Sequence, residues 1–374
     1  MMDTGAVVIP PYVGRPLRLA PFHGVRLNPR RVGDPASGRL FARPYRAVAA
    51  RLTQWQERGQ LRRDDEPALY LHEYTAAGLT VRGLVGALDI SHRASGPEDR
   101  AVLPHEGIHP VQADELADRM TELALNPAPI LLVHRAPASV RAIVHRVIEE
   151  PPVDEFVDRN DQRHRVWAIR DPALLAGIDE GLAQSQALIA DGHHRYAAYL
   201  RMQRRSPGGA TDRGLAMLVD QEDTPLFLGP IHRVLTGVGL DDLAAAAEVI
   251  GARLELVDRS AAVHALGPAT LAATDGRRWA SVKLHLAQDR AAVEQLHEEL
   301  VPALPRGPQR IEYHHSVEAT LSRLRRDSVA VLMPAPDVDL VLKIAADDRL
   351  LPEKATSFQP KPSVGVLIRS LRDG

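Results

Sequence analysis

The segment Ala187-Leu188-Ile189-Ala190-Asp191-Gly192-His193-His194-Arg195-Tyr196 is the most informative part of this 374-residue chain. Its first four residues form a short apolar run, which predicts a buried strand over 187–190. The polar pair Asp191-Gly192 ends that run, and a helical pattern then continues to about Arg205. Ser206-Pro207-Gly208-Gly209 stops the helix, because proline and glycine both disfavour a helix interior. The segment therefore predicts a strand, a tight turn and a helix.

The predicted turn is suited to hold an anion. We expect Asp191 to be the N-cap of the helix, where its carboxylate accepts from an amide and contributes on the order of 1 kcal/mol. Gly192 has no side chain, so a ligand can approach the remaining amides at the positive end of the helix. His193, His194 and Arg195 add donors from the first turn, and a guanidinium can hold two phosphate oxygens. The alternative is a capped, basic helix start whose histidines are solvated or packed.

The composition is that of a globular protein, with 45% hydrophobic and 25% charged residues, and the length allows two or three domains. The formal net charge of -2 gives no overall attraction to nucleic acid or to an anionic membrane, so neither is an expected partner. The absence of cysteine excludes disulfides, thiolate nucleophiles and cysteine-ligated zinc. The start of the chain lacks the features of a signal peptide, and no apolar run approaches the roughly 20 residues of a membrane span. We therefore expect a cytoplasmic protein.

Lysine is scarce in this chain. The 46 basic residues include only four lysines, at Lys283, Lys343, Lys354 and Lys361. A lysine that persists in such an arginine-rich chain indicates a site that needs a compact ammonium rather than a guanidinium. The alternative is that each is an ordinary surface residue.

Hydrophobic periodicity predicts further strands and helices on both sides of the opening segment. The expected strands cover 68–74, 79–89, 130–134, 165–170, 215–220 and 226–229. The expected helices cover 112–125, 139–149 and 240–250, with another that starts at Asp171-Pro172. The first 50 residues are rich in Pro, Gly and Arg and show little periodicity.

This mixture of hairpins and helices predicts an α+β fold with a mixed sheet. We expect three regions, which are an irregular lead-in over 1–65, a phosphate-binding core over 66–206 and a C-terminal α/β domain over 210–374. The breaks fall at polar or Pro- and Gly-rich stretches.

The turn also resembles known phosphate-binding motifs. Gly192-His193-His194-Arg195-Tyr196-Ala197-Ala198 resembles the motif of ParB-type CTPases and the signature of sulfiredoxins. His193 stands where a sulfiredoxin has its catalytic Cys, so sulfiredoxin chemistry is excluded. The Asp-Gly-His-His-Arg form is similar to that of free serine kinases, which phosphorylate free L-serine. The resemblance implies a ParB/sulfiredoxin-like nucleotide-binding core with additional α/β elements.

The resemblance to free serine kinases extends to two further segments in the same order along the chain. Pro104-His105-Glu106 is similar to the segment that supplies the catalytic base, which implies that role for Glu106. Pro352-Glu353-Lys354-Ala355-Thr356 is similar to a C-terminal stretch of those kinases, which places Lys354 and Thr356 at the nucleotide phosphates. Nearly the whole chain also resembles the family called domain of unknown function 1015. Where that family usually has Pro-Pro-Tyr-Asp, this chain has Arg43-Pro44-Tyr45-Arg46.

A competing reading of one segment is a zinc site. His105-Glu106-Gly107-Ile108-His109 matches the pattern in which two histidines one helical turn apart bind zinc. Gly107 weakens a helix there, and Pro110 disfavours helical geometry at His109. We therefore expect a loop, which leaves Glu106 available as an acid or base. His314-His315 is a second candidate ligand pair, but adjacent side chains diverge on regular elements.

The leading hypothesis is phosphotransfer to a small hydroxylated metabolite, with serine as the acceptor that the resemblance implies. The Asp191–Arg195 turn holds the phosphates of ATP or ADP, with Mg²⁺ bridging them and Asp191 as a metal ligand. Glu106 accepts the proton of the attacking hydroxyl, and Lys354 neutralises charge on the transferred group. The alternative is a nucleotide-binding regulatory module of the ParB type, which needs the phosphate turn but neither Glu106 nor an acceptor pocket.

Overall fold

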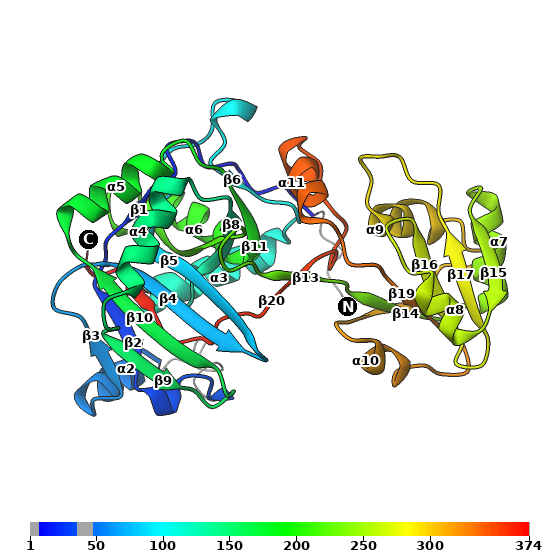
Figure 1. The fold of residues 1–374 in the computed structure, drawn as a ribbon, viewed down its shortest axis with the longest axis horizontal. Coiled ribbons are helices and arrows are strands. Elements are labelled where there is room, and N and C mark those ends of the chain that lie inside the picture. The colour runs from blue at the N-terminus through cyan, green and yellow to red at the C-terminus, as the bar shows by residue number, and fades with distance from the viewer. Residues whose placement is uncertain (1–6, 36–47, 374) are drawn as a thin grey trace. The chain divides into compact units, whose positions relative to one another are not determined.

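The computed structural model describes residues 7–35 and 48–373. The chain divides into two compact units, of which the first contains Met1–Leu226 together with Pro360–Gly374 and the second contains Phe227–Gln359 (Figure 1). We expected a break near residue 210, but β12 (Arg213–Asp220) is hydrogen-bonded to strands of the first unit. The boundary between the two units therefore lies after β12, at Leu226.

A mixed sheet forms the centre of the first unit (Figure 1). Within the described residues its strand order is β6 (Val102–Leu103), β11 (Ala187–Asp191), β8 (Ile130–His134), β12, β5 (Leu79–Asp89), β4 (Leu69–Ala76), β10 (Arg163–Ile169) and β9 (Asp154–Val157), with β1 (Leu19–Ala20) paired to β5. A smaller sheet has the order β3 (Leu61–Arg63), β2 (Gly24–Leu27), β21 (Ile368–Ser370) and β7 (Leu125–Asn126).

Two helix pairs pack with the mixed sheet around one hydrophobic core, α3 with α6 and α4 with α5. The helices described in this unit are α2 (Val48–Glu57), α3 (Pro110–Leu123), α4 (Ala138–Ile148), α5 (Pro172–Leu182) and α6 (His193–Arg205), with single 3-10 turns at Pro29–Arg31, Pro97–Asp99 and Ala210–Asp212. The start of α5 is as the sequence predicts, because Asp171 is its N-cap and accepts from the amides of Ala173 and Leu174.

The second unit contains an antiparallel sheet with the order β15 (Arg253–Val257), β17 (Trp279–Lys283), β16 (Thr270–Thr274), β19 (Ser328–Leu332), β14 (His232–Thr236) and β18 (Arg310–His314). A separate strand pair joins β13 (Phe227–Gly229) to β20 (Ser357–Gln359). The helices described are α7 (Leu240–Val249), α8 (Arg259–His264), α9 (Ala292–Gln295), α10 (Val317–Leu321) and α11 (Val338–Ala346), with a π-helical turn over Leu296–Leu300.

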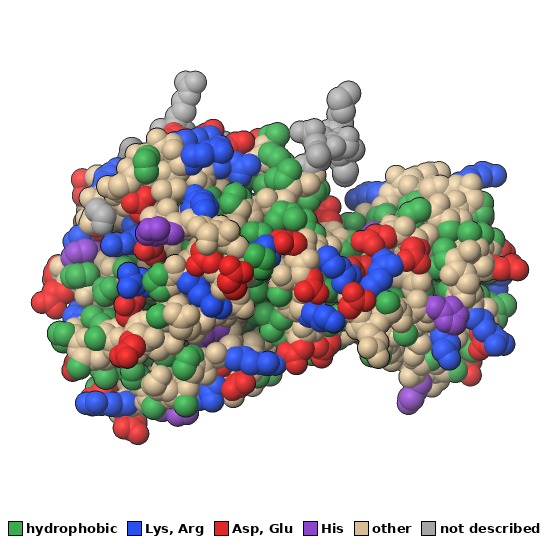
Figure 2. Space-filling view, turned by 90° about the horizontal axis from the view of Figure 1, so that it is seen from above, with side chains coloured by type: hydrophobic (Ala, Val, Ile, Leu, Met, Phe, Trp, Pro, Cys, Tyr) green, Lys and Arg blue, Asp and Glu red, His purple; other side chains and the backbone are tan. Residues whose placement is uncertain are grey.

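The structure confirms the predicted α+β class, and the predicted strands and helices agree with it to within a few residues at each end. The lead-in over 1–65, predicted to be irregular, instead contains the helix α2 together with short strands and one 3-10 turn. None of the described helices combines the length and apolarity needed to cross a membrane. Figure 2 shows basic and acidic side chains interspersed over one face of the molecule. The segment Arg43-Pro44-Tyr45-Arg46 lies outside the described residues.

The C-terminal residues return to the first unit and are fastened there by a buried arginine. Arg369 in β21 is 3% exposed and donates to the side-chain oxygen of Asn126 and to the carbonyls of Arg213 and Ala210, at 3.1, 2.9 and 2.8 Å. Burial lowers the pKa of Arg369 to about 10, which leaves it charged at neutral pH. These bonds link β21 to β7 and to the start of β12.

We expect Arg369→Met to lower the free energy of unfolding by about 1–3 kcal/mol, because the substitution leaves buried acceptors without their donor. Urea titration of the full chain measures this change. Arg372→Met is the matched control, since Arg372 is exposed. Equal losses of unfolding free energy in the two variants would show that the buried contacts of Arg369 do not stabilise the fold.

Candidate functional site

Two segments that are far apart in the sequence meet at one edge of the mixed sheet. Strand β6 runs parallel to β11, with Val102 opposite Ala187 and Leu103 opposite Leu188. Parallel neighbours end at the same edge of a sheet. The loop that follows β6, residues 104–109, therefore lies beside the turn that follows β11. Both predicted site segments are thus brought together by strand pairing.

Helix α6 begins differently from the expectation. The N-cap is Gly192, with φ +98° and no side-chain hydrogen bond, so the prediction that Asp191 caps the helix is wrong. A left-handed φ of this kind favours glycine. A Cβ atom at this position would also lie 3.0 Å from Nε of Arg195. Gly192 therefore makes room for the guanidinium of Arg195, rather than only for a ligand.

Asp191 lies between two cations. Arg195 donates from Nη2 to Oδ2 of Asp191 at 2.5 Å, and Lys361 pairs through its ammonium with Oδ1. Arg195 also donates to the carbonyl of Pro129. Burial by itself would raise the pKa of Asp191, but the charges of Arg195 and Lys361 outweigh it and hold that pKa below its usual value. The carboxylate is therefore ionised at neutral pH.

The two histidines of the turn hold the neighbouring loop. Nε2 of His193 accepts from the amides of His105 and Glu106, at 3.3 and 3.4 Å. Nε2 of His194 accepts from the amide of His109 at 3.1 Å. A ring nitrogen that accepts carries no proton, so each neutral ring has its proton on Nδ1. The predicted phosphate donors His193 and His194 thus position the backbone that carries Glu106.

Two buried tyrosines fix the rest of α6. The hydroxyl of Tyr196 donates to the carbonyl of Pro11 at 2.8 Å and accepts from the amide of Val13 at 3.1 Å. The hydroxyl of Tyr199 donates to the carbonyl of Ala128 at 3.2 Å, next to the residue that Arg195 contacts. The sequence Arg-Tyr-x-x-Tyr therefore encodes anchors for the helix as well as one charged group.

The lysine at Asp191 is Lys361, which the sequence did not assign to the site. Its backbone is held by Tyr74, whose hydroxyl donates to the carbonyl of Pro360 at 2.6 Å, and by Gln162, whose amide donates to the carbonyl of Lys361 at 3.0 Å. The scarcity of lysine was the available signal, but it applied equally to all four lysines. Only the fold distinguishes Lys361.

The two C-terminal residues that the sequence predicts for the site, Lys354 and Thr356, belong to the second unit. Lys354 is exposed, with φ +57°, and its carbonyl accepts from Nη2 of the buried Arg233 at 2.9 Å. Arg233 thus holds the backbone of Lys354 in a left-handed conformation that residues other than glycine adopt rarely. The roles of Lys354 and Thr356 at a phosphate stay predictions.

The described residues contain no group of three or more His, Asp or Glu side chains arranged to hold a metal. The loop reading of the segment from His105 to His109 is confirmed, because α3 starts at Pro110 and the two histidines do not share a helix. Asp191 does not fit Mg²⁺ in this arrangement, since each of its oxygens already faces a cation. In the second unit, His315 contacts the hydroxyl of Ser357 at 3.0 Å.

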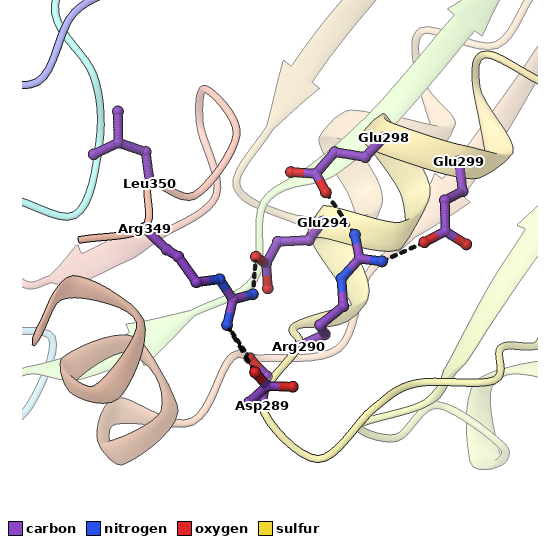
Figure 3. A pocket seen from close by; sticks show the side chains of 7 residues that line it. All are labelled: Asp289, Arg290, Glu294, Glu298, Glu299, Arg349 and Leu350. Carbon is purple, nitrogen blue, oxygen red and sulfur yellow. Dashed lines mark hydrogen bonds and ion pairs between the residues drawn. The ribbon is translucent and has the colours of Figure 1, made fainter. Parts of the chain in front are cut away.

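The second unit has a large open pocket of about 600 Å³ that differs in character from the Asp191 turn (Figure 3). Four carboxylates and two guanidinium groups line it, together with one leucine: Asp289, Glu294, Glu298, Glu299, Arg290, Arg349 and Leu350. Arg349 pairs with Asp289 and Glu294, and Arg290 pairs with both Glu298 and Glu299. This excess of negative charge is unsuited to a phosphate.

The fold and the basic turn at Asp191 define an α+β protein with a candidate anion site at the start of α6. Residues 19–301 match the model of the family described as protein of unknown function DUF1015. The chain belongs to this family. No curated protein matches it.

Several solved structures are distantly similar. SbnI with a C-terminal truncation, from Staphylococcus aureus, matches over 72% of this chain and 83% of its own, with 12% identity and a TM-score of 0.41. A free serine kinase variant in complex with ADP matches over 71% and 88%, with 16% identity and a TM-score of 0.38. A conserved hypothetical protein from Pyrococcus furiosus matches over 73% and 94%, with 15% identity and a TM-score of 0.39.

Acid sensitivity is expected of the loop beside the turn. His105 is fully buried, and burial lowers its pKa to about 3, below the ordinary value of 6.5. Between these two values the unfolded chain binds the proton more strongly than the folded chain, so stability falls as the pH is lowered through this range. One such group contributes a slope of at most about 1.4 kcal/mol per pH unit.

We expect His105→Gln to reduce the pH dependence of the free energy of unfolding between pH 6.5 and pH 4.5, measured by urea titration at several pH values. The comparison at pH 7.5 is the control, because His105 is neutral there in both the folded and the unfolded chain. An unchanged slope would show that His105 does not titrate on unfolding.

Proposed function

We propose that this protein is a nucleotide-dependent phosphotransferase that acts on a small hydroxylated metabolite, with free serine as one such acceptor. The observation that carries the proposal is the contact between the two site segments. His193 accepts from the amides of His105 and Glu106, which brings the candidate base to the candidate phosphate turn. The same two segments carry the sequence resemblance to free serine kinases.

Each group at the turn has a role in this proposal. The amides at the start of α6 and the guanidinium of Arg195 bind the phosphates of ADP or ATP, because a helix N-terminus and a planar guanidinium both suit phosphate oxygens. Arg195 already contacts Asp191 and uses two of its five donors in the contacts described above. In this proposal the remaining donors bind the nucleotide. His193 and His194 act through the loop that they hold.

The chemical step is a direct transfer. Glu106 accepts the proton of the acceptor hydroxyl, whose oxygen forms a bond to the terminal phosphorus as the bridging P–O bond breaks. The shortened nucleotide leaves with the electron pair of that bond. Phosphoryl transfer depends mainly on positioning and on charge stabilisation. A preorganised phosphate turn beside a base offers both.

We expect Arg195→Ala to weaken the binding of ADP by about 10–100-fold, because a hydrogen bond to a charged group contributes about 1.5–3 kcal/mol. Isothermal titration calorimetry measures the change. Arg205→Ala is the control on the same helix, since Arg205 forms an ion pair with Asp118 on the protein surface. Unchanged binding by the Arg195 variant would place the phosphates elsewhere.

We expect Glu106→Gln to retain nucleotide binding and to slow transfer by at least about a hundredfold, because a general base typically contributes 10²–10⁴-fold to the rate. The assay follows phosphate transfer to a panel of hydroxylated metabolites that includes serine. Undiminished transfer by this variant would assign the base to another residue. If the parent protein binds nucleotide but transfers phosphate to no metabolite, a regulatory module of the ParB type becomes the better description.

A further inference from the structure

Both oxygens of the Asp191 carboxylate are paired with cationic side chains of the same chain. Oδ2 is engaged by Arg195 and Oδ1 by Lys361. A Mg²⁺ ion bound to a nucleotide site is typically held by one or two carboxylates and by the phosphates of the substrate. At this turn, such an ion would have to bind the carboxylate beside two cations that are already paired with it.

The charges of the three side chains favour a free anion over a metal complex. Asp191, Arg195 and Lys361 together carry a net charge of +1, the start of α6 adds the partial positive charge of its amides, and the carboxylate of Glu106 belongs to the neighbouring loop. An added Mg²⁺ would be repelled by this positive field and by the two cations already paired with Asp191. A nucleotide phosphate without a metal is attracted by the same field.

Lys361 is built into this position by the chain around it. Its carbonyl accepts from Gln162, and the preceding carbonyl of Pro360 accepts from Tyr74. Ser363 donates from its amide to the side-chain oxygen of the same Gln162 at 3.2 Å. These contacts fix the backbone on both sides of Lys361. They do not restrain the ammonium group at the end of its side chain.

The pair remains accessible to a solute. The side chain of Lys361 is 47% exposed and that of Asp191 is 27% exposed. An ammonium on a flexible four-carbon stem can turn from a carboxylate to a nearby phosphate without a change in the backbone. A purely structural clip for the C-terminal segment does not need this exposure, since Tyr74 and Gln162 already hold that segment.

We propose that the ammonium of Lys361 is the resident cation of the phosphate turn, in the place at Asp191 that a divalent ion would take. Nucleotide phosphates then bind without Mg²⁺, and Lys361 moves from Asp191 onto the phosphate. The inference rests on the proposed nucleotide site, and it identifies the counter-charge of that site. It also predicts that Mg²⁺ competes with the protein for the phosphates.

The test is calorimetry of the full chain with ADP, in EDTA and in millimolar Mg²⁺. We expect the wild-type protein to bind ADP in EDTA at least as tightly as in Mg²⁺. We expect Lys361→Met to bind ADP about 10–100-fold more weakly in EDTA, the range typical of a lost charged hydrogen bond. Lys361→Arg retains the charge and should recover part of the affinity. Lys343→Met, at an exposed lysine of α11, is the control and should bind as the wild type does.

The outcomes separate this inference from the proposed function. Binding of ADP by the wild type only when Mg²⁺ is present would overturn the inference and leave the nucleotide site intact. Thermal melting checks that the Lys361→Met variant is folded. If this variant and the wild type then bind ADP with equal affinity, the inference is overturned and Lys361 has only a structural role. No binding of ADP by the wild type in either buffer would remove the proposed function and this inference together.

Discussion

The parallel pairing of β6 with β11 is the constraint on which the candidate site depends. The pairing of Val102–Leu103 with Ala187–Leu188 makes the two strands end at the same edge of the sheet. The loop that carries Glu106 and the turn that carries Asp191 are neighbours for this reason alone. The histidines of the turn then accept from the amides of the loop, so the side chains refine an arrangement that the sheet has already made.

Electrostatics at the turn follow from two cations that share one carboxylate. Asp191 is shared by Arg195 and Lys361, and the trio keeps one unit of positive charge. That charge lies at the start of α6, where the helix amides carry a partial positive charge. The two positive contributions together favour the binding of an anion. The acidic pocket of the second unit has the opposite balance (Figure 3).

The return of the C-terminal residues gives the first unit a part of its site. Arg369 fastens β21 in the core, and Tyr74 and Gln162 hold the segment that carries Lys361. The chain therefore leaves the first unit after Leu226 and comes back at Pro360, followed by Lys361, the second cation paired with Asp191. A break placed by composition near residue 210 separates β12 from strands to which it is hydrogen-bonded.

Periodicity and turn chemistry by themselves determined the class of fold, most strands and helices, and the strand–turn–helix at Asp191, because these depend on neighbouring residues. The sequence also singled out Glu106 and the Asp191–Arg195 turn. Only the tertiary structure decided that Gly192 rather than Asp191 is the N-cap, and that Lys361 pairs with Asp191. The carboxylate of Asp191 is paired with Arg195 and with Lys361, and Lys361 comes from a segment that returns from the end of the chain, a long-range partner that no local pattern records.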